Sequence, residues 1–291
     1  LTPPEAFVYE EAGLPGSRPR QLRWRTPMAA TAEEEIVTYA LHGAVAVIGL
    51  NRPAKRNAIS DRVIDALDAA VNRAETEAKA AVLHGAGKHF SAGLDLGEHR
   101  EKPLIDAVSG SRRWHEVFAR IERGRIPYVA ALQGAVVGGG FELAASAHVR
   151  VADPAAFFAM PEGTRGIFVG GGGAVRIARL IGAARMGDMM LTGRVVPADE
   201  MERWGGVSYL AEDGAALDKA MELAARTAEN AEFSNYAILN ALSRIQDMSS
   251  EDGLFVESIM SALTSVTPEA KERLAAFLER GANKVAAPKD G

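Results

Sequence analysis

Three consecutive glycines at positions 138–140 stand between an apolar run and a helix-forming run, and they carry the first chemical signal of the sequence. The apolar run covers 128–132 and is bounded by Pro127, and helix formers fill 141–147. Glycines at a strand-to-helix turn let a ligand lie against bare backbone. Because the N-terminus of a helix leaves N–H groups unpaired, this turn suits a substrate oxygen that gains negative charge during a reaction.

Two glutamates occupy positions where the chain fixes the direction of a carboxylate. Glu142 is expected on the first turn of the helix that follows the glycines. Glu162 lies between Pro161 and Gly163, neither of which favours a regular helix, so its side chain projects from a fixed turn. Each glutamate also has an alternative interpretation without a chemical role. Glu142 complements the helix dipole while the glycines only ease packing, and Glu162 is an exposed surface residue.

A second glycine run, at 170–173, follows Glu162. Its composition is that of a phosphate-binding loop, but no Gly-Lys-Ser/Thr sequence follows it, and the spacing of a dinucleotide-binding turn is missing. The sequence therefore favours loop flexibility as the reason for these glycines.

Composition limits the class of protein. The 291 residues are 47% hydrophobic and 24% charged, which indicates a soluble globular protein with one large domain and appendages, although two domains would also fit. A net charge of -5 gives no basic field, so nucleic acid is not the expected partner. No apolar run reaches membrane-spanning length, and the expected location is the cytoplasm. The absence of cysteine and of paired histidines predicts no disulfide and no metal site.

The order of apolar runs and helical patterns predicts an α/β fold. A hairpin is expected at 36–50, and Ser60 or Asp61 caps a helix whose apolar residues recur at helical spacing up to Val71. Ligand-type loops follow the strands, so they gather at the strand ends. The expected strands cover 36–40, 44–50, 80–84, 128–132 and 149–152, and a further helix covers 180–192.

Four segments are expected along the chain. Residues 1–35 form an irregular, proline-punctuated extension without the features of a secretory signal or transit peptide, and Met28 within it is an alternative start. Residues 36–213 form the α/β core, 214–284 a helical C-terminal region and 285–291 a frayed tail. The expected helices of the C-terminal region cover 215–230, 235–246, 254–264 and 269–280.

Four motifs, in order and spacing, resemble the signatures of the crotonase, or enoyl-CoA hydratase/isomerase, superfamily, and the resemblance is closest to enoyl-CoA hydratases. The motifs are Leu50-Asn-Arg-Pro-Ala-Lys-Arg-Asn-Ala58, Phe90-Ser-Ala-Gly-Leu-Asp-Leu96, Gly134-Ala-Val-Val-Gly-Gly-Gly-Phe-Glu-Leu-Ala144 and Met160-Pro-Glu-Gly163. The resemblance implies an α/β crotonase (ClpP-like) fold of repeated ββα units, with two roughly perpendicular sheets and a helical C-terminal region. It also implies assembly into a homotrimer or a homohexamer.

The resemblance assigns an oxyanion hole to two backbone N–H groups, those of Leu94 and Gly139. Polarising an acyl-CoA thioester builds enolate charge on its oxygen, and fixed donors stabilise that charge more than the neutral ground state. A side chain added at Gly139 is then expected to enter the space of the thioester and to leave the fold undisturbed.

Glu142 and Glu162 match the paired glutamates of enoyl-CoA hydratases, and two carboxyl groups that share a site separate in proton affinity. The resemblance therefore implies hydration of the α,β-double bond of an enoyl-CoA to a 3-hydroxyacyl-CoA. Glu142 would take the proton of the water that attacks Cβ, and Glu162 would deliver a proton to Cα. Isomerases often keep only the later glutamate, so the pair favours a hydratase. The alternative is an isomerase, or another acyl-CoA lyase or dehydratase of the superfamily.

CoA is expected to bind at the 51–58 loop and the 91–96 turn. Arg52 and Lys55 are candidate phosphate partners, with solvated loop cations as the alternative. CoA is part of the acyl-CoA substrate, so no separate cofactor is expected, and the implied setting is β-oxidation in fatty acid metabolism. The candidate substrate- and CoA-binding residues are Arg52, Lys55, Asn57, Ala58, Ser91, Ala92, Gly93, Asp95, Leu96 and Gly138.

The sequence does not determine the acyl group. Val169 and the glycines after it replace a Pro-Gly-Ala-Gly-Gly run of many hydratases. Phe157, Phe158 and Phe168 add aromatic bulk nearby, which either shapes the acyl pocket or belongs to the core, and the core is the favoured interpretation.

A crotonase-fold protein without catalysis, or one that binds RNA, is the alternative from another class. A non-catalytic relative would have lost a carboxylate or a glycine donor, and this chain keeps both. RNA binding requires a basic face, and acidic residues interrupt the one arginine cluster, so this cluster is interpreted as a solvated helix face. The cluster comprises Arg112, Arg113, Arg120, Arg123 and Arg125, with Glu116 and Glu122 between them.

Overall fold

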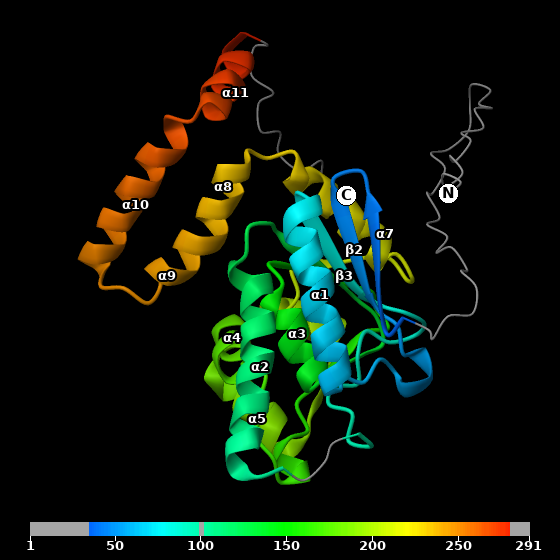
Figure 1. The fold of residues 1–291 in the computed structure, drawn as a ribbon. Coiled ribbons are helices and arrows are strands. Elements are labelled where there is room, and N and C mark those ends of the chain that lie inside the picture. Colours follow the sequence, from blue (N-terminus) through cyan, green and yellow to red (C-terminus); the bar gives the residue numbers. More distant parts are fainter. Residues whose placement is uncertain (1–34, 99–101, 280–291) are drawn as a thin grey trace, which may run out of the picture. The chain divides into compact units, whose positions relative to one another are not determined.

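The computed structural model describes residues 35–98 and 102–279 (Figure 1). The predicted N-terminal extension, apart from Glu35, and the predicted tail at 285–291 lie outside the described residues. Within the described part of the chain, no helix is long and apolar enough to cross a membrane.

A six-stranded sheet forms the centre of the fold. In spatial order its strands are β1 (Val37–His42), β2 (Val45–Leu50), β3 (Ala80–Gly85), β4 (Tyr128–Leu132), β6 (Val149–Ala152) and β9 (Tyr209–Leu210). β1 and β2 form the predicted antiparallel hairpin, which turns at Gly43 with a positive φ. The other neighbours are parallel. Every residue of β4 is buried, as is typical of a parallel strand with both faces covered.

A second sheet contains β5 (Ala135–Val137), β7 (Phe157–Ala159) and β8 (Val195–Pro197). β5 follows β4 after only two residues, and β7 follows β6 closely, so consecutive strands enter different sheets. A helix follows each of these pairs of strands, α3 after β4 and β5 and α4 after β6 and β7, which gives the predicted ββα repeat. This change of sheet places the turn after β5 and the turn after β7 next to each other, because β5 and β7 are parallel neighbours.

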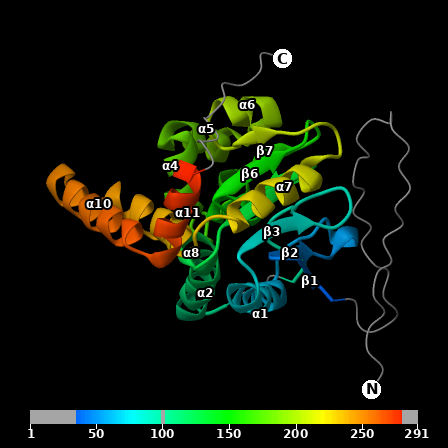
Figure 2. The same ribbon diagram turned by 90° about the horizontal axis from the view of Figure 1, so that it is seen from above.

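Helices cover both faces of the large sheet (Figures 1 and 2). In β4, Val129 and Ala131 belong to the core cluster that α7 closes, while Ala130 and Leu132 belong to the larger cluster with α1 and α2. The α-helices are α1 (Asp61–Glu77), α2 (Leu104–Arg123), α3 (Gly139–Ser146), α4 (Gly173–Ile181), α5 (Ala183–Thr192), α6 (Ala198–Arg203), α7 (Ala216–Ala228), α8 (Glu232–Ala237), α9 (Ser243–Ile245), α10 (Ser250–Ser265) and α11 (Pro268–Glu279). The shorter turns are η1 (Pro53–Lys55), η2 (Gly163–Arg165) and the π-helical η3 (Ile238–Leu242).

The predicted strands are confirmed, and the helix predicted at 180–192 is confirmed from Ala183 to Thr192, but its predicted start is wrong. α4 ends at Ile181, Gly182 adopts a φ of 86°, and α5 begins at Ala183. Apolar residues continue on both sides of Gly182, so their periodicity hid the break that a left-handed glycine makes. No helix was predicted at α6, and the helix face expected at the arginine cluster was predicted without bounds for α2.

The helical C-terminal region is confirmed with two changes. The helix predicted at 235–246 consists of α8 and α9 joined by the π-helical turn. The helix predicted from Leu254 starts earlier, at Ser250, because the Ser249 hydroxyl accepts the Asp252 N–H at 3.1 Å and caps it.

The arginine cluster lies on or next to α2 and is paired with acids, as expected of a solvated helix face. Arg113 Nη2 lies 2.9 Å from Asp68 Oδ2, and Arg120 pairs with the same carboxylate from about two turns further along α2. These ion pairs join the solvent-facing sides of α1 and α2, which lie side by side in the fold.

α10 and α11 leave large apolar side chains exposed. Phe255 of α10 is 67% exposed, and few buried residues anchor either helix. Apolar patches of this kind mark protein–protein contacts. The exposed apolar residues of the two helices are Leu254, Phe255, Ile259, Leu263, Leu274, Phe277 and Leu278.

We predict that these helices mediate self-association. Analytical ultracentrifugation at micromolar concentration should give a mass that is a multiple of 30.9 kDa, and the double change Leu254→Glu, Phe255→Glu should lower it, because charges do not enter an apolar interface. Leu41→Glu, at an exposed leucine of β1, is the control and should leave the mass unchanged. A single-chain mass for the unmodified protein would contradict the prediction.

Candidate active site

A pocket of about 430 Å³ brings together residues that the sequence places far apart. Glu142 and Glu162 both line it, and so do Leu94 and Gly139. The four residues with predicted chemical roles therefore face one space. Much of the remaining wall is apolar or small, and includes Trp114, Ile167, Phe168, Val169, Gly170 and Gly171.

Glu142 is buried and held by backbone N–H groups. It lies on the first turn of α3, as predicted, and is only 3% exposed. Its Oε1 accepts the N–H of Gly171 at 2.8 Å and the N–H of Gly173 at 2.7 Å. A Cβ on Gly173 would lie 2.9 Å from Glu142 Cγ, so this loop needs glycine for close approach. The prediction that the 170–173 glycines serve loop flexibility is therefore wrong.

Glu162 is buried with one oxygen unpaired. It precedes η2 and is 7% exposed, so the interpretation as a surface residue is wrong. Its Oε2 has no hydrogen-bond partner in the described part of the chain. The side chain lies over Gly138, where a Cβ would stand 2.7 Å from Glu162 Oε1. Gly138, with a φ of 51°, thus turns the chain and leaves room for the carboxylate.

Burial raises the pKa of both carboxyl groups above the ordinary value, but their surroundings differ. The N–H groups of Gly173 and Gly171 oppose the rise in the Glu142 pKa, and the positive charge of Arg176 adds to that opposition. The Glu162 pKa is raised by burial and also by the charge of Glu142. The hydrogen bonding therefore favours an ionised Glu142 and a protonated Glu162, within a pair that titrates together.

The N–H groups of Leu94 and Gly139 lie next to each other. A Cβ built on Gly139 would lie 3.6 Å from Leu94 N, and one built on Gly93 would lie 3.2 Å from Gly139 N. A β-bridge from Ser91 to Val136 holds the loop against β5, and a second one from Leu94 to Ile59 holds it against the segment before α1. Among the described residues, no protein acceptor takes either N–H. Both donors are thus free to bind a substrate oxygen, and the predicted oxyanion hole is geometrically feasible.

The expectation that a side chain at Gly139 would leave the fold undisturbed needs correction. An added Cβ would stand 2.8 Å from Cζ3 of Trp114 and 3.2 Å from its Cη2. Trp114 is 8% exposed and packs edge-to-face with Phe118, so its ring has little freedom to move. Gly139 is therefore required for packing against α2 as well as for the position of its N–H.

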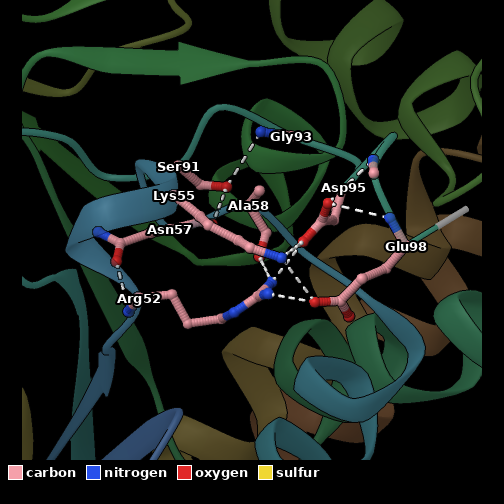
Figure 3. A network of polar contacts seen from close by, with 9 residues as sticks. Arg52, Lys55, Asn57, Ala58, Ser91, Gly93, Asp95 and Glu98 are labelled. Atoms are coloured by element: carbon pink, nitrogen blue, oxygen red, sulfur yellow. Dashed lines mark hydrogen bonds and ion pairs between the residues drawn. The ribbon is translucent and has the colours of Figure 1, made fainter.

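The predicted phosphate partners, Arg52 and Lys55, are engaged in ion pairs (Figure 3). Arg52 Nη1 lies 2.9 Å from Asp95 Oδ2, and Lys55 Nζ lies 2.8 Å from Glu98 Oε1. Although burial raises the Asp95 pKa, hydrogen bonds from Arg52 and then Lys55 outweigh it and lower that pKa. These contacts join the 51–58 loop to the 91–98 turn. Phosphate binding by the two cations stays a prediction.

The other predicted CoA-binding residues build the same pair of loops. Asn57 Nδ2 donates to the carbonyls of Ala86 and His89, and Ser91 Oγ donates to Asn57 O at 2.8 Å. Ser91 Oγ also accepts the Gly93 N–H at 3.1 Å (Figure 3). These bonds fix the turn that presents the Leu94 N–H.

Three further residues of the set lie along these loops. Ala58 O accepts from Arg52, and Ala92 N–H donates to Arg56 O. Leu96 is 52% exposed. Contact of any of these residues with CoA stays a prediction.

The three aromatic residues near the second loop divide between core and pocket. Phe158 is fully buried against Phe141, which confirms the core interpretation for it. Phe168 is 71% exposed and lines the pocket, so the core interpretation is wrong for that residue. Phe157 lies in β7 and is half-buried. Phe168 and Trp114 are thus the aromatic walls of the pocket.

Gly171, Gly173 and Trp114 are site residues that sequence reasoning missed. The glycine run was visible, but its purpose depends on Glu142, which is distant in sequence and adjacent only in the fold. No cluster of three metal-ligating side chains occurs among the described residues.

Comparisons with known proteins agree with the geometry. The family model described as enoyl-CoA hydratase/isomerase matches residues 41–286. The 2,3-dehydroadipyl-CoA hydratase of Escherichia coli is 32% identical over 81% of this chain and 92% of that protein. The short-chain-enoyl-CoA hydratase of Clostridium acetobutylicum is 32% identical over 82% of this chain and 92% of that protein. The crystal structure of an enoyl-CoA hydratase from Bacillus anthracis has a TM-score of 0.79 and 27% identity, over 84% of this chain and 96% of that one.

Glu162→Gln should not destabilise the protein at neutral pH. The folded-state pKa of Glu162 is raised, so between 4.5 and that raised value the native state binds more protons than the unfolded state. Stability therefore falls as pH rises through this window, and the substitution removes that loss. Thermal melts at pH 7 should give an equal or higher Tm for the variant, and the difference should shrink towards pH 5. Glu229→Gln, at an exposed position, is the control; a lower Tm for Glu162→Gln at pH 7 would refute this account.

Gly139→Ala should lower the Tm, because the added methyl group meets the Trp114 ring. The matched control is Gly187→Ala in α5, where an added Cβ has open space. Replacing a glycine inside a helix by alanine there should stabilise the protein by about 0.5–1 kcal/mol. Thermal melts of both variants test the packing. An unchanged Tm for Gly139→Ala would contradict the packing role and leave only the proposed role of its N–H group.

Proposed function

The chain belongs to the enoyl-CoA hydratase/isomerase family of the crotonase superfamily, and we propose that it adds water across the α,β-double bond of an enoyl-CoA to give a 3-hydroxyacyl-CoA. One observation carries this proposal. The two glutamates face one pocket, and backbone N–H groups hold the carboxylate of Glu142 while Glu162 Oε2 has no hydrogen-bond partner. One base and one acid are what addition of water requires.

In the proposed reaction, the thioester oxygen accepts hydrogen bonds from the N–H groups of Leu94 and Gly139. These donors stabilise the enolate that forms when the water oxygen bonds to Cβ. The ionised Glu142 takes a proton from that water, and the protonated Glu162 delivers its proton to Cα. The product has gained one water. The enzyme is left with Glu142 protonated and Glu162 ionised, and one proton must pass between the two sites, through solvent or directly, before the next turnover.

Hydration is favoured over double-bond isomerisation by the way that Glu142 is held. An isomerase moves a proton between carbons and needs no second carboxylate for water. Here the chain uses two loop glycines and their N–H groups to hold Glu142 in the pocket. A fixed second carboxylate is needed if Glu142 takes a proton from water, and it is not needed for isomerisation.

The pocket wall indicates the chemical character of the acyl group but not its identity. Trp114 and Phe168 give one side of the pocket an aromatic, largely apolar surface, which suits an acyl chain better than a strongly polar group. Two relatives of equal identity carry different acyl groups in their names, a short chain and a dehydroadipyl group. We propose an acyl-CoA substrate, an oligomeric enzyme and no separate cofactor.

Replacing either glutamate should abolish most of the hydration. Glu142→Gln and Glu162→Gln should each lower turnover by about 10²–10⁴-fold, the usual contribution of a positioned acid or base, with little effect on binding of the CoA ester. The assay follows the loss of conjugated thioester absorbance over a panel of enoyl-CoAs, with mass spectrometry of the products.

Glu229→Gln should behave as the unmodified enzyme in the same assay, since Glu229 lies outside the pocket. Hydration by Glu142→Gln close to that of the unmodified enzyme would contradict the role of Glu142 as base, and a product with a moved double bond and no added water would support the isomerase alternative. No hydration of any enoyl-CoA by the unmodified enzyme would refute the proposal outright.

A further inference from the structure

Behind Glu142, the buried Arg176 binds the loop that supplies the two N–H donors. Arg176 belongs to α4 and is 8% exposed. Its Nη1 donates to Gly171 O at 3.0 Å. Its Nε and Nη2 lie 3.0 Å and 2.9 Å from Oε2 of Glu122, which belongs to α2. The guanidinium thus connects the glycine loop to the helix behind it.

The bond to Gly171 O acts on the peptide unit that controls both donors. The N–H groups that hold Glu142 belong to the peptides 170–171 and 172–173, and the Gly171 carbonyl belongs to the peptide between them. The orientation of that middle peptide sets the ψ angle of Gly171 and the φ angle of Gly172. A run of glycines has more backbone freedom than any other sequence, so without an external contact these rotations would be loose.

The geometry of Gly172 agrees with this arrangement. Its φ of 100° is open to glycine and strained for other residues. A Cβ on Gly172 would collide with the Arg176 guanidinium. The loop and Arg176 are therefore fitted to each other, and the fit turns the neighbouring N–H groups towards Glu142.

The ion pair with Glu122 keeps Arg176 in place. A buried guanidinium is costly to desolvate unless it is paired and hydrogen-bonded, and Glu122 supplies the opposite charge with two contacts to one oxygen. The backbone of Glu122 is held in α2, and its carbonyl also lies 3.0 Å from His148 Nε2. A chain of contacts therefore runs from α2 through Arg176 and the glycine loop to the carboxylate.

We propose that Arg176 is a positioning residue for Glu142: it orients the carboxylate towards the attacking water by holding the Gly171–Gly173 loop. This inference rests on the proposed hydration. It predicts a selective defect, because Glu142 acts on the water, while β-bridges hold the loop of Leu94 and Glu162 lies on a different turn, directly before η2.

The test compares two reactions of Arg176→Met. Hydration of an enoyl-CoA should lose about 10–100-fold in kcat, as expected for a misplaced catalytic group, with KM within about twofold. Exchange of the α-proton of butyryl-CoA with D₂O needs only the thioester donors and Glu162 in its ionised form, the form that hydration leaves behind and that acts as base in the reverse reaction, so its rate should change little. Mass spectrometry follows the exchange, and thermal melts accompany both assays.

Arg179→Met is the matched control. Arg179 lies on the same helix, its side chain is 46% exposed, and its Nη2 donates to both carboxylate oxygens of Asp247 at 2.8 Å. Loss of an exposed ion pair should leave both reactions unchanged. Arg176→Lys keeps the positive charge but loses the planar fork, so its kcat should lie between those of the unmodified enzyme and Arg176→Met. If Arg176→Met does not fold, the same two reactions are compared in Arg176→Lys.

The outcomes separate the two proposals. If the unmodified enzyme hydrates its substrate and the Arg176 variants do so at the same kcat, the positioning role is overturned and the proposed function stands. A parallel fall of hydration, exchange and Tm would also overturn it, since Arg176 would then support the fold as a whole. Absence of hydration in the unmodified enzyme would overturn both proposals.

Discussion

The structure depends on keeping two carboxyl groups in one buried pocket. Desolvation makes each carboxylate unfavourable, and the repulsion between Glu142 and Glu162 adds to that cost. The chain offsets this cost to a different extent for the two carboxylates. Glu142 receives two backbone N–H groups from the Gly171–Gly173 loop, whereas Glu162 keeps an unpaired oxygen. In the proposed reaction, this inequality gives one base and one acid from two identical side chains.

The fold serves this pocket by the way in which its strands change sheet. β4 and β5, and then β6 and β7, pass from the large sheet to the small one, so the turns after β5 and β7 meet. One turn leads to Gly139 and Glu142, and the other leads to Glu162. Glycines at 138, 171 and 173 then allow backbone and carboxylate to approach more closely than any side chain would permit. Packing and chemistry are therefore inseparable at these positions.

Sequence reasoning predicted the residues with chemical roles better than the contacts that hold them. The resemblance of the motifs to the crotonase superfamily implied roles for Glu142, Glu162, Leu94 and Gly139, and the structure places all four at one pocket. The same reasoning read the 170–173 glycines as flexible, because their partner is far away in sequence. Side-chain pairing is equally invisible in a sequence, which is why the internal ion pairs of Arg52 and Lys55 were not foreseen. The break at Gly182 was hidden by a continuous apolar pattern.

The central claim is that water adds at Cβ while a solvent-derived proton reaches Cα. The most direct measurement is the reaction of the unmodified enzyme with an enoyl-CoA in deuterium oxide enriched in oxygen-18, followed by mass spectrometry and NMR of the product. The account predicts a product with one heavy oxygen on Cβ and one deuterium on Cα at early conversion. A product without heavy oxygen, in which the double bond has moved to Cβ and Cγ and the deuterium lies on Cα, would contradict it.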